Sequence, residues 1–428
     1  MISLSHLIAN PDIYKNELTK RFKDVSSVDS LIGIYNQYKP AQNQLELLRQ
    51  KKNQFNQVVI TLQGQEKIDK ISEMKLISDQ IQALEVTTRE LNVKQNTLLS
   101  KIPNLTWEGI PVAKNDEGNV EIARYGTKPE FDFQPLNYYD LPVFKRDYDS
   151  VKGVEAAGFR GFYIKGEVAK LQKALFDWTM DRLIAKGFNY IIPPIFVTED
   201  VMLGTGFFPD GQEDCYKVEA GQKDFYLPGT SEAALMYYHS NQTVQMVDPI
   251  KLTAYTRCFR KEAGSYGKDT KGGMRVNQFE KIETVFLCKP SISTQVFDEM
   301  TKIFQESIDL LGLHYHNLEV SSGDISIKNH RQIDIEAWFP AQEAFRELCS
   351  ASNCTDYQTR TLNIKCEDNG EIVIAHSLNC TGMTNRTLFA VMEQFQQKHG
   401  TVKIPEVDRK STRLNSSHVS QSRMPSSA

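Results

Sequence analysis

The sequence predicts an α+β protein: an N-terminal antiparallel two-helix coiled-coil arm, followed by a mixed, mainly antiparallel β-sheet flanked by helices. Two observations support this fold class. Apolar residues in the first hundred positions recur in alternating steps of three and four, which is the spacing of a heptad seam. After about residue 148, runs rich in β-branched and aromatic residues alternate with helical patterns, with few strand–helix–strand repeats.

Composition restricts the class of protein further. The chain has 428 residues, enough for two domains, and its 40% hydrophobic and 24% charged residues are ordinary for a globular protein. The formal net charge is −4, so a nucleic-acid partner would need a local basic patch. The sequence has no signal-peptide pattern and no apolar run near the roughly 18 residues of a membrane span, which predicts no membrane partner. Seven cysteines without a C-x-x-C pair favour reduced thiols in a cytoplasmic protein.

The arm is the first predicted element. One seam consists of Leu31, Ile34, Tyr38, Ala41, Leu45, Leu48, Lys52, Phe55, Val59 and Leu62. The other consists of Met74, Ile77, Ile81, Leu84, Thr88, Leu91, Gln95 and Leu98. Gly64 lies between the seams, where the chain would reverse, and Pro40 would kink the first helix or mark its start. Five lysines toward the tip form a weak basic cluster for phosphates: Lys51, Lys52, Lys67, Lys70 and Lys75. On periodicity alone, a dimerisation or spacer coil is an equal alternative to an arm that grips a partner.

Glycine, proline and serine-rich positions mark the boundaries between the predicted segments of the chain. The predicted segments are the arm at 1–103, a connector at 104–147 with one short strand pair, a main domain at 148–409 and a disordered, non-native Ser-rich tail at 410–428. Helices are predicted at 167–187 and 385–400, each ending at a glycine. Strands are predicted at 188–197, 251–260, 281–289, 331–340 and 370–378. The pair Pro193–Pro194 places the first of these strands at a sheet edge or an interface.

The stretch "CFRKEAGSYGKDTKGGMRVNQFEKIE" at 258–283 contains several charged residues that are candidates for binding a ligand. If it is a β-hairpin with a long loop, Arg260 and Glu262 share one face of the first strand, since strand side chains repeat every two residues. Phe279, Lys281 and Glu283 share a face of the returning strand by the same rule. An arginine fork suits a phosphate and a carboxylate can accept a base amine. A solvated charged hairpin is the alternative interpretation.

This stretch resembles motif 2 of the class II aminoacyl-tRNA synthetases, in their seryl branch. "GFNYIIPPIFV" is similar to motif 1, whose proline lies at a dimer interface, and "HSLNCTGMTNRTLFAVMEQFQ" is similar to motif 3. "LPGTSEAAL" and "AWFPAQEAFRELCSASNCTDYQTR" resemble the serine-site and metal–ATP segments of that branch. The resemblance extends from residue 1 to about 409. It implies a class II synthetase-type catalytic domain at 148–409 and a tRNA-binding arm at 1–103.

The resemblance also implies roles for individual residues. Catalysis would rest on Arg260 and Arg386, which neutralise phosphate charge. ATP would contact Arg260, Lys261, Glu262, Arg275, Glu347, Leu348, Cys349, Ser350 and Arg386. Serine would contact Thr230, Ser231, Glu232, Glu283, Asn379 and Thr381. Mg²⁺ would be held by Glu347 and Ser350 through hard oxygen ligands. Two departures from the pattern stand out: Asn277 replaces a usual histidine, and motif 3 is one residue short.

The implied activity is ATP-dependent conversion of L-serine to seryl-adenylate, followed by transfer of the seryl group to the 3′ end of tRNA(Ser). The resemblance leaves tRNA(Sec) open as a second acceptor. It also implies a homodimer formed through motif 1 around Pro193, a cytoplasmic location and tRNA(Ser) held by the arm. The alternatives are a non-catalytic RNA-binding paralogue and an amino acid:carrier-protein ligase. Outside the motifs, Asp334 and Glu336 are expected to form salt bridges at the core edge, and His376 to be a hydrogen-bonded strand histidine.

Overall fold

The computed structural model describes residues 1–58, 62–262, 271–406 and 418–419. Its internal contacts divide the chain into two units. The smaller unit is Ile2–Pro103, and the larger comprises Met1 together with Asn104–Ala428. None of the described helices is both long enough and apolar enough to cross a membrane.

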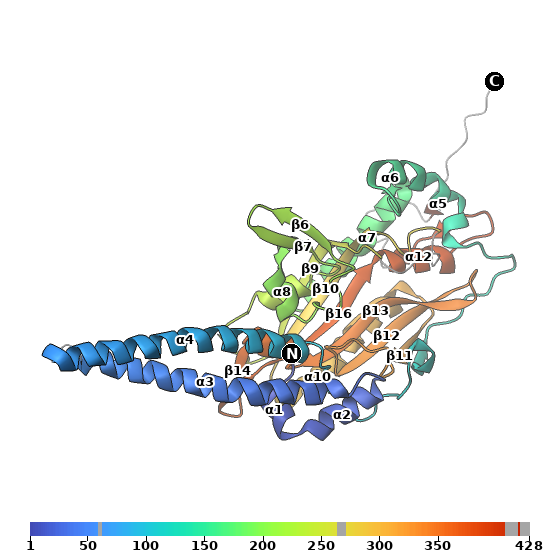
Figure 1. Cartoon of the computed structure of the whole chain (residues 1–428). Helices are drawn as coiled ribbons and strands as arrows, with labels where there is room; N and C mark the ends of the chain where they lie inside the picture. Colours follow the sequence, from blue (N-terminus) through green and yellow to red (C-terminus); the bar gives the residue numbers. More distant parts are fainter. Residues whose placement is uncertain (59–61, 263–270, 407–417, 420–428) are drawn as a thin grey trace. The chain divides into compact units, whose positions relative to one another are not determined.

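The smaller unit contains four helices within the described residues: α1 (Leu4–Ala9), α2 (Pro11–Lys20), α3 (Ser26–Val58) and α4 (Gly64–Leu99). The long helices α3 and α4 pack side by side, which confirms the predicted helix pair (Figure 1). Gly64 opens α4 with φ of 62°, in the left-handed region that glycine tolerates. Pro40 lies inside α3, so it does not mark the start of that helix.

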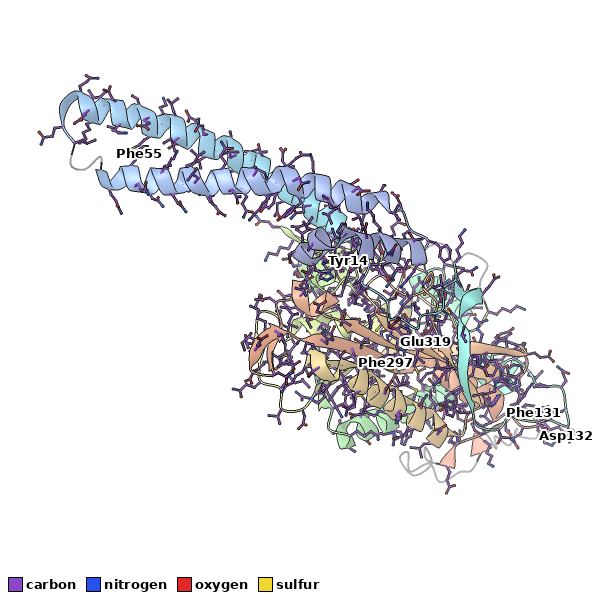
Figure 2. All side chains as sticks on the ribbon, turned by 90° about the horizontal axis from the view of Figure 1, so that it is seen from below. Tyr14, Phe55, Phe131, Asp132, Phe297 and Glu319 are labelled. Carbon is purple, nitrogen blue, oxygen red and sulfur yellow. The ribbon has the colours of Figure 1, made fainter. Side chains whose placement is uncertain are left out.

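The predicted seam forms the contact between α3 and α4. Its central buried cluster is made of Leu45, Leu48, Ile77 and Ile81. Nearer the tip, Phe55 packs against this cluster, and the Lys70 ammonium lies 4.6 Å from the centre of the Phe55 ring (Figure 2). Two polar seam residues are also buried. Thr88 Oγ1 donates to Leu84 O at 2.7 Å, whereas Gln95 Oε1 has no hydrogen-bond partner within the described residues. An unpaired buried acceptor costs about 1–3 kcal/mol, so the polar positions weaken the coil.

The larger unit is built on one large sheet. Within the described residues it has eight strands in the order β1-β11-β12-β13-β16-β10-β9-β4. Their bounds are β1 Val120–Tyr125, β4 Asn189–Tyr190, β9 Ile250–Phe259, β10 Gln278–Cys288, β11 Tyr315–Glu319, β12 Arg331–Phe339, β13 Ala344–Thr355 and β16 His376–Thr384. Only β4 and β9 pair in parallel among these neighbours, and the other pairs are antiparallel. This confirms the predicted mixed, mainly antiparallel sheet.

Smaller elements surround the large sheet. The minor sheets have the strand orders β5-β7-β6, β15-β14-β8, β2-β3 and β17-β18. Their strands are β2 Tyr148–Asp149, β3 Tyr163–Ile164, β5 Val197–Thr198, β6 Tyr216–Ala220, β7 Lys223–Leu227, β8 Thr243–Val244, β14 Lys365–Asp368, β15 Glu371–Ile374, β17 Val402–Lys403 and β18 His418–Val419. The shorter helices are α5 Pro142–Asp147, α6 Ser150–Ala157, α8 Glu199–Gly204, α9 Glu232–Tyr237 and α11 Tyr357–Thr361.

Three longer helices cover one face of the large sheet: α7 (Gly166–Ala185), α10 (Ser293–Leu311) and α12 (Asn385–Gln394). Phe176, Phe297 and Phe389, one from each helix, are buried in the same core as Ile282 and Phe286 of β10. Because strand side chains alternate between faces, the residues between these core positions point to the opposite face of the sheet. That opposite face carries the polar side chains of β10, β12, β13 and β16.

The hairpin of β9 and β10 is present, but the expected strand extension through Glu262 is wrong. β9 ends at Phe259, and the next residues leave the ladder: Arg260 N donates to Asn277 O at 3.0 Å, and Lys261 N donates to Asp214 O at 2.8 Å. Glu262 then takes φ of 55°, in the left-handed region. Strand alternation therefore does not explain why Arg260 and Glu262 share a site. The predicted glycine- and lysine-containing loop falls largely on residues 263–270, which lie outside the described residues.

Other boundaries also differ from expectation. The strand predicted at 370–378 is two strands that separate at Ala375, and the connector strand β1 pairs with β11 in the large sheet. The helix predicted to reach Gly400 ends at Gln394, because Gln396 forms a bridge with Val402 and its amide donates to Leu136 O at 2.9 Å.

Two expectations concern the edge and the end of the chain. β4 is an edge strand of the large sheet, as the double proline predicts. The tail at 410–428 lies outside the described residues except for β18, which pairs with β17.

Candidate functional site

A cavity of about 250 Å³ opens on the sheet face opposite the helix-covered core. The period of two along each strand builds its wall. On β10, Phe279 and Lys281 line the cavity, whereas Ile282 packs into the core. On β16, Asn379 and Thr381 likewise face the cavity. Strands far apart in sequence therefore deliver polar side chains to one place.

The structure brings most of the sequence-predicted site residues together. Those in the cavity wall are Thr230, Glu232, Arg260, Glu262, Glu347, Leu348, Ser350, Asn379, Thr381 and Arg386. Glu283 contacts the wall through Thr230. Arg275 lies beside it, where its Nη1 is 3.3 Å from Glu262 Oε2.

Four further predicted residues neither line this wall nor contact it in the ways just described. Ser231 is buried and its hydroxyl has no hydrogen-bond partner within the described residues, while Cys349 packs in the core. Ser231 and Cys349 are therefore not among the described residues that line the cavity, and their expected ligand contacts stay predictions. Lys261 is exposed, with its ammonium 5.9 Å from the centre of the Tyr216 ring. Pro193 is buried in the loop that follows β4.

Arg260 is fixed from several sides. Its guanidinium lies 5.2 Å from the centre of the Phe279 ring, and Nη2 donates to Gly229 O at 3.4 Å. Asn277 Nδ2 donates to the carbonyl oxygens of Arg260 and Lys261, at 3.0 and 3.2 Å. The asparagine that departs from the family pattern therefore supports the backbone that carries Arg260.

A second arginine lies across the cavity. Arg386 is in the first turn of α12, whose N-cap Thr384 Oγ accepts from Arg386 N at 3.2 Å. Arg386 Nη1 donates to Glu347 Oε2 at 2.7 Å and to Glu347 O at 3.1 Å. Burial opposes ionisation of Glu347, but the guanidinium outweighs it and the pKa of Glu347 is lowered. The pair gives this end of the cavity both a cation for phosphates and an ionised carboxylate.

Oxygen ligands gather beside this pair. Asp334 lies opposite Ser350 in the β12–β13 ladder and is hydrogen-bonded to it, and Gln332 Nε2 donates to Asp334 Oδ1 at 2.9 Å. Burial and the nearby Glu347 carboxylate raise the pKa of Asp334. Two carboxylates that repel one another beside a hydroxyl fit a hard divalent cation such as Mg²⁺.

Of the salt bridges expected for Asp334 and Glu336, one is found in the structure. The expected salt bridge of Asp334 is wrong among the described residues, because its partners are neutral. Glu336 does pair with a base, His316 Nε2, at 3.0 Å.

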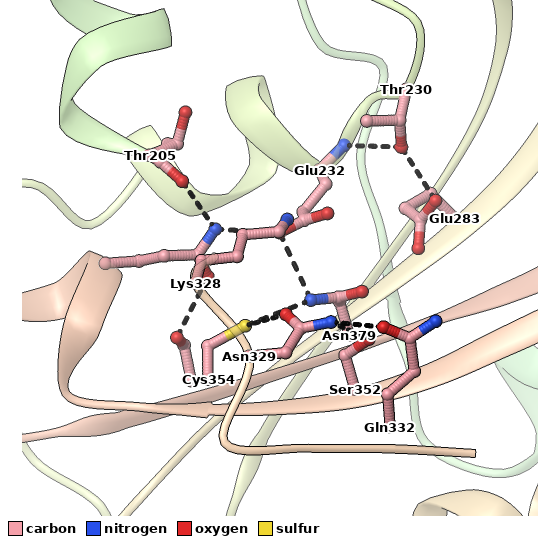
Figure 3. Close-up of polar contacts among 12 residues, drawn as sticks. Thr205, Thr230, Glu232, Glu283, Lys328, Asn329, Gln332, Ser352, Cys354 and Asn379 are labelled. Atoms are coloured by element: carbon pink, nitrogen blue, oxygen red, sulfur yellow. Dashed lines mark hydrogen bonds and ion pairs between the residues drawn. The ribbon is translucent and has the colours of Figure 1, made fainter. Parts of the chain in front are cut away.

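Two lysine–glutamate pairs lie beside the same cavity, and Figure 3 labels Glu232, Lys328 and Glu283 of these pairs. Thr230 Oγ1 donates to Glu283 Oε2 at 2.7 Å, and the same carboxylate forms an ion pair with Lys281. Glu232 forms the second ion pair, with Lys328. All four charged side chains are at most 10% exposed. Buried carboxylates with matched donors suit a small ligand that carries an ammonium and a hydroxyl group.

Sequence reasoning gave no site role to Lys281, Lys328 or Gln358. Lys281 could have been found, because the two-residue period already places it between Phe279 and Glu283. Lys328 lies in a turn before β12, where no period applies, so the sequence carries no signal for it. His376 is not in the wall, and the expected hydrogen bonding is wrong for its Nδ1, which is buried without a partner within the described residues. Burial lowers the pKa of His376 to about 4.

Known proteins match both units. Residues 1–106 match the seryl-tRNA synthetase N-terminal domain, and residues 216–395 match the class II tRNA synthetase core domain (G, H, P, S and T). The chain is 34% identical to a serine–tRNA ligase of Petrotoga mobilis, over 95% of this chain and 97% of the relative.

Two solved structures are also similar over nearly their full length. A crystal structure of seryl-tRNA synthetase from Pyrococcus horikoshii complexed with ATP has a TM-score of 0.86 and 30% identity, covering 97% of this chain and 98% of that one. A cytoplasmic serine–tRNA ligase from Naegleria fowleri in complex with AMP has a TM-score of 0.80 and 28% identity, covering 94% and 95%.

Proposed function

The chain belongs to the seryl-tRNA synthetase family, and from that premise we propose that it is a serine–tRNA ligase. It activates L-serine with ATP to seryl-adenylate and transfers the seryl group to the 3′ end of tRNA(Ser). One observation carries this proposal beyond the family: Arg260 and Arg386 line the same cavity as Thr230 and Lys281, which both contact Glu283. Groups suited to a triphosphate and groups suited to a small amino acid therefore meet in one cavity.

The first step needs no nucleophilic side chain. The serine carboxylate oxygen attacks the α-phosphorus, the bond from phosphorus to the bridging oxygen breaks, and pyrophosphate leaves with the electron pair. Arg260, held by Phe279 and Gly229, would neutralise charge at the α-phosphate. Arg386 and Arg275 would take the β- and γ-phosphates. Positioning and charge neutralisation supply the rate in such a reaction.

Glu347 and Ser350 would hold Mg²⁺, with Asp334 beside them. When bound, the cation neutralises phosphate charge and helps to orient the triphosphate. Arg386 keeps Glu347 ionised, so the carboxylate is available as a hard ligand.

Serine recognition would rest on the residues around Glu232 and Glu283. A carboxylate pairs with the ammonium, and the remaining oxygens and amides of Glu232, Asn379 and Thr381 bond the hydroxyl. An amino acid without the hydroxyl leaves these buried groups unpaired, which costs about 1–3 kcal/mol per group. The geometry therefore favours serine over alanine.

In the second step, a 3′-terminal ribose hydroxyl attacks the seryl carbonyl and AMP leaves. The α3–α4 arm would bind tRNA(Ser) through shape and phosphate contacts. A homodimer would form around Pro193, a proposal supported by the exposed apolar side chains of Ile192 and Phe196 nearby, which are 82% and 50% exposed. Cysteines that are all free and buried support the cytoplasm as the compartment.

The decisive experiment is serine-dependent exchange of pyrophosphate into ATP, measured across the twenty amino acids. Wild-type protein should exchange with serine. Arg260→Ala should lose exchange by about 100-fold or more, as when a charge-stabilising donor is removed. Arg257→Ala is the matched control, because Arg257 is an arginine of β9 three residues before Arg260, its side chain is 65% exposed and it is not among the residues that line this cavity.

Retained exchange in Arg260→Ala would reject the site assignment. Absence of exchange in wild-type protein that still binds tRNA would instead favour a non-catalytic RNA-binding protein. A carrier-protein ligase is disfavoured because the ligase relatives match the arm as well as the core.

A further inference from the structure

Lys328 is a buried cation inside the cavity wall. Its side chain is 8% exposed, and its ammonium lies 4.1 Å from the centre of the Phe207 ring while forming an ion pair with Glu232. A lysine taken this far from water needs a carboxylate partner, since an isolated buried charge is strongly disfavoured. Lys328 is therefore fixed in place by the same carboxylate that the serine site uses.

Glu232 is held at one of its two oxygens. Oε1 accepts from Gln358 Nε2 at 2.7 Å and from Asn379 Nδ2 at 3.1 Å, in addition to its contact with Lys328 (Figure 3). Gln358 is anchored in turn, because its Nε2 also donates to Thr205 O at 2.9 Å. Oε2 of Glu232 takes no hydrogen bond from the part of the chain that the structure describes. This oxygen is available to a ligand.

The second carboxylate is arranged differently. Glu283 Oε2 accepts from Thr230 and pairs with Lys281, and these two partners also contact each other at 3.3 Å. The two lysines cancel the formal charges of the two glutamates. Which carboxylate receives the ammonium of an amino acid thus depends on how firmly each lysine holds its partner.

We propose that Lys328 is a specificity-determining positioning residue of the amino-acid pocket. By fixing Glu232 and cancelling its charge, Lys328 leaves Glu232 Oε2 to accept from the substrate hydroxyl, and the ammonium goes to Glu283. This inference rests on the proposed serine activation and names a residue that controls it. Without Lys328, Glu232 carries an uncompensated charge and attracts the ammonium. Serine is then misplaced, and alanine is rejected less strongly.

Lys328→Met tests this directly, because methionine keeps an apolar chain beside Phe207 and removes the ammonium. Pyrophosphate exchange is measured with serine and with alanine, and KM is determined for serine and for ATP. The serine KM should rise about tenfold or more, as expected for loss of a charged hydrogen bond that positions the site. The ratio of kcat/KM for serine over alanine should fall by about the same factor. The KM for ATP should not change, whereas general damage to the fold would change both.

Lys251→Met is the matched control. Lys251 is a partly buried lysine on β9 that pairs with Glu299 at 2.8 Å, and it does not line the cavity. Its removal should leave the serine KM and the selectivity unchanged.

If Lys328→Met folds poorly, the double variant Lys328→Met/Glu232→Gln removes both buried charges. It should recover ATP binding and still fail to prefer serine. Serine KM and selectivity equal to wild type in a folded Lys328→Met would overturn the inference and leave the ligase activity standing. Wild-type protein without serine-dependent exchange would overturn both.

Discussion

Gly229, which has no side chain, makes room for the cavity residue Arg260. At Gly229, an added Cβ would lie 2.8 Å from Arg260 Nε and 3.0 Å from Arg260 Cγ, closer than real Cβ contacts allow. The glycine therefore permits the close approach of its carbonyl to the Arg260 guanidinium, at 3.4 Å. The phosphate-binding role proposed for Arg260 therefore depends on the glycine it packs against.

Gly229→Ala should displace Arg260 while leaving the fold intact, because the crowded atoms belong to a flexible side chain. We expect the KM for ATP to rise about tenfold, since small misplacements of positioning groups cost up to about 100-fold in rate. The serine KM and the melting temperature should change little. Exchange kinetics and thermal unfolding are the measurements. Gly33→Ala in α3 is the control, because nothing lies within 4 Å of its added Cβ. An unchanged KM for ATP would contradict the role of Gly229.

The sequence assigned Glu283, Asn379 and Thr381 to the site through resemblance to family motifs, and the strand pairing explains why they lie together. Glu283, Asn379 and Thr381 lie on adjacent strands, and the alternation of side chains brings them to one face. No site role was predicted from the sequence for Lys328 and Gln358, which reach Glu232 from a turn and a short helix. Their positions depend on how distant segments pack, and no local pattern encodes that packing.

Among the elements, β1 shows how a connector strand is attached to the catalytic sheet. His316 on β11 has its Nδ1 2.7 Å from Glu121 Oε2 of β1 and its Nε2 3.0 Å from Glu336 Oε2 of β12. The imidazole also stacks on Phe345 with ring centres 3.8 Å apart. Burial disfavours protonation, but Glu336 and Glu121 outweigh it, and the pKa of His316 is raised. When it is protonated, His316 joins β1, β11 and β12.

The raised pKa makes the attachment of β1 dependent on pH. Since the folded-state pKa lies above the ordinary value of 6.5, the stabilisation is complete below about pH 6.5 and is lost as the pH rises through the folded-state pKa. Hydrogen exchange of the β1 amides, corrected for intrinsic rates, should show protection that declines with rising pH over that range. His316→Gln should show lower protection without this pH dependence. Equal pH profiles for the two proteins would contradict the role of His316.

Element boundaries follow from tertiary contacts that the sequence pattern does not contain. The heptad seams predicted α3 and α4 because a coil seam is a local repeat. The helix expected to reach Gly400 stops at Gln394, where the side chain of Gln396 bonds the backbone of Leu136 instead. The end of α12 therefore depends on a contact with Leu136, which lies 260 positions from Gln396 in the sequence.

At the scale of the whole molecule, the chain separates two tasks between its two units. Every described residue that lines the cavity belongs to the larger unit, whereas the long helix pair belongs to the smaller one. The smaller unit has little apolar core along its arm, and exposed lysines occur toward its tip. Changes to those lysines should therefore affect tRNA binding and leave amino-acid activation unaltered.

Charge reversal at the tip tests this separation. Lys51→Glu, Lys67→Glu and Lys75→Glu change three exposed lysines that make no ion pair within the described residues. In the combined variant we expect serine-dependent pyrophosphate exchange at the wild-type rate, because the cavity is untouched. The KM for tRNA in aminoacylation should rise about tenfold or more, and the salt dependence of tRNA binding should weaken, since each lost phosphate contact lowers the slope by about 0.7–0.9.

The matched control reverses three exposed lysines of the same unit away from the tip: Lys20, Lys39 and Lys94. Because the net charge of this control equals that of the tip variant, a difference between the two isolates position from overall charge. An equal loss of tRNA binding in both would mean that only the long-range field matters. Wild-type aminoacylation in the tip variant would contradict binding at the arm tip. Loss of exchange in the tip variant would show instead that the two units are coupled, because none of the arm residues that the structure describes contributes to the wall of the cavity.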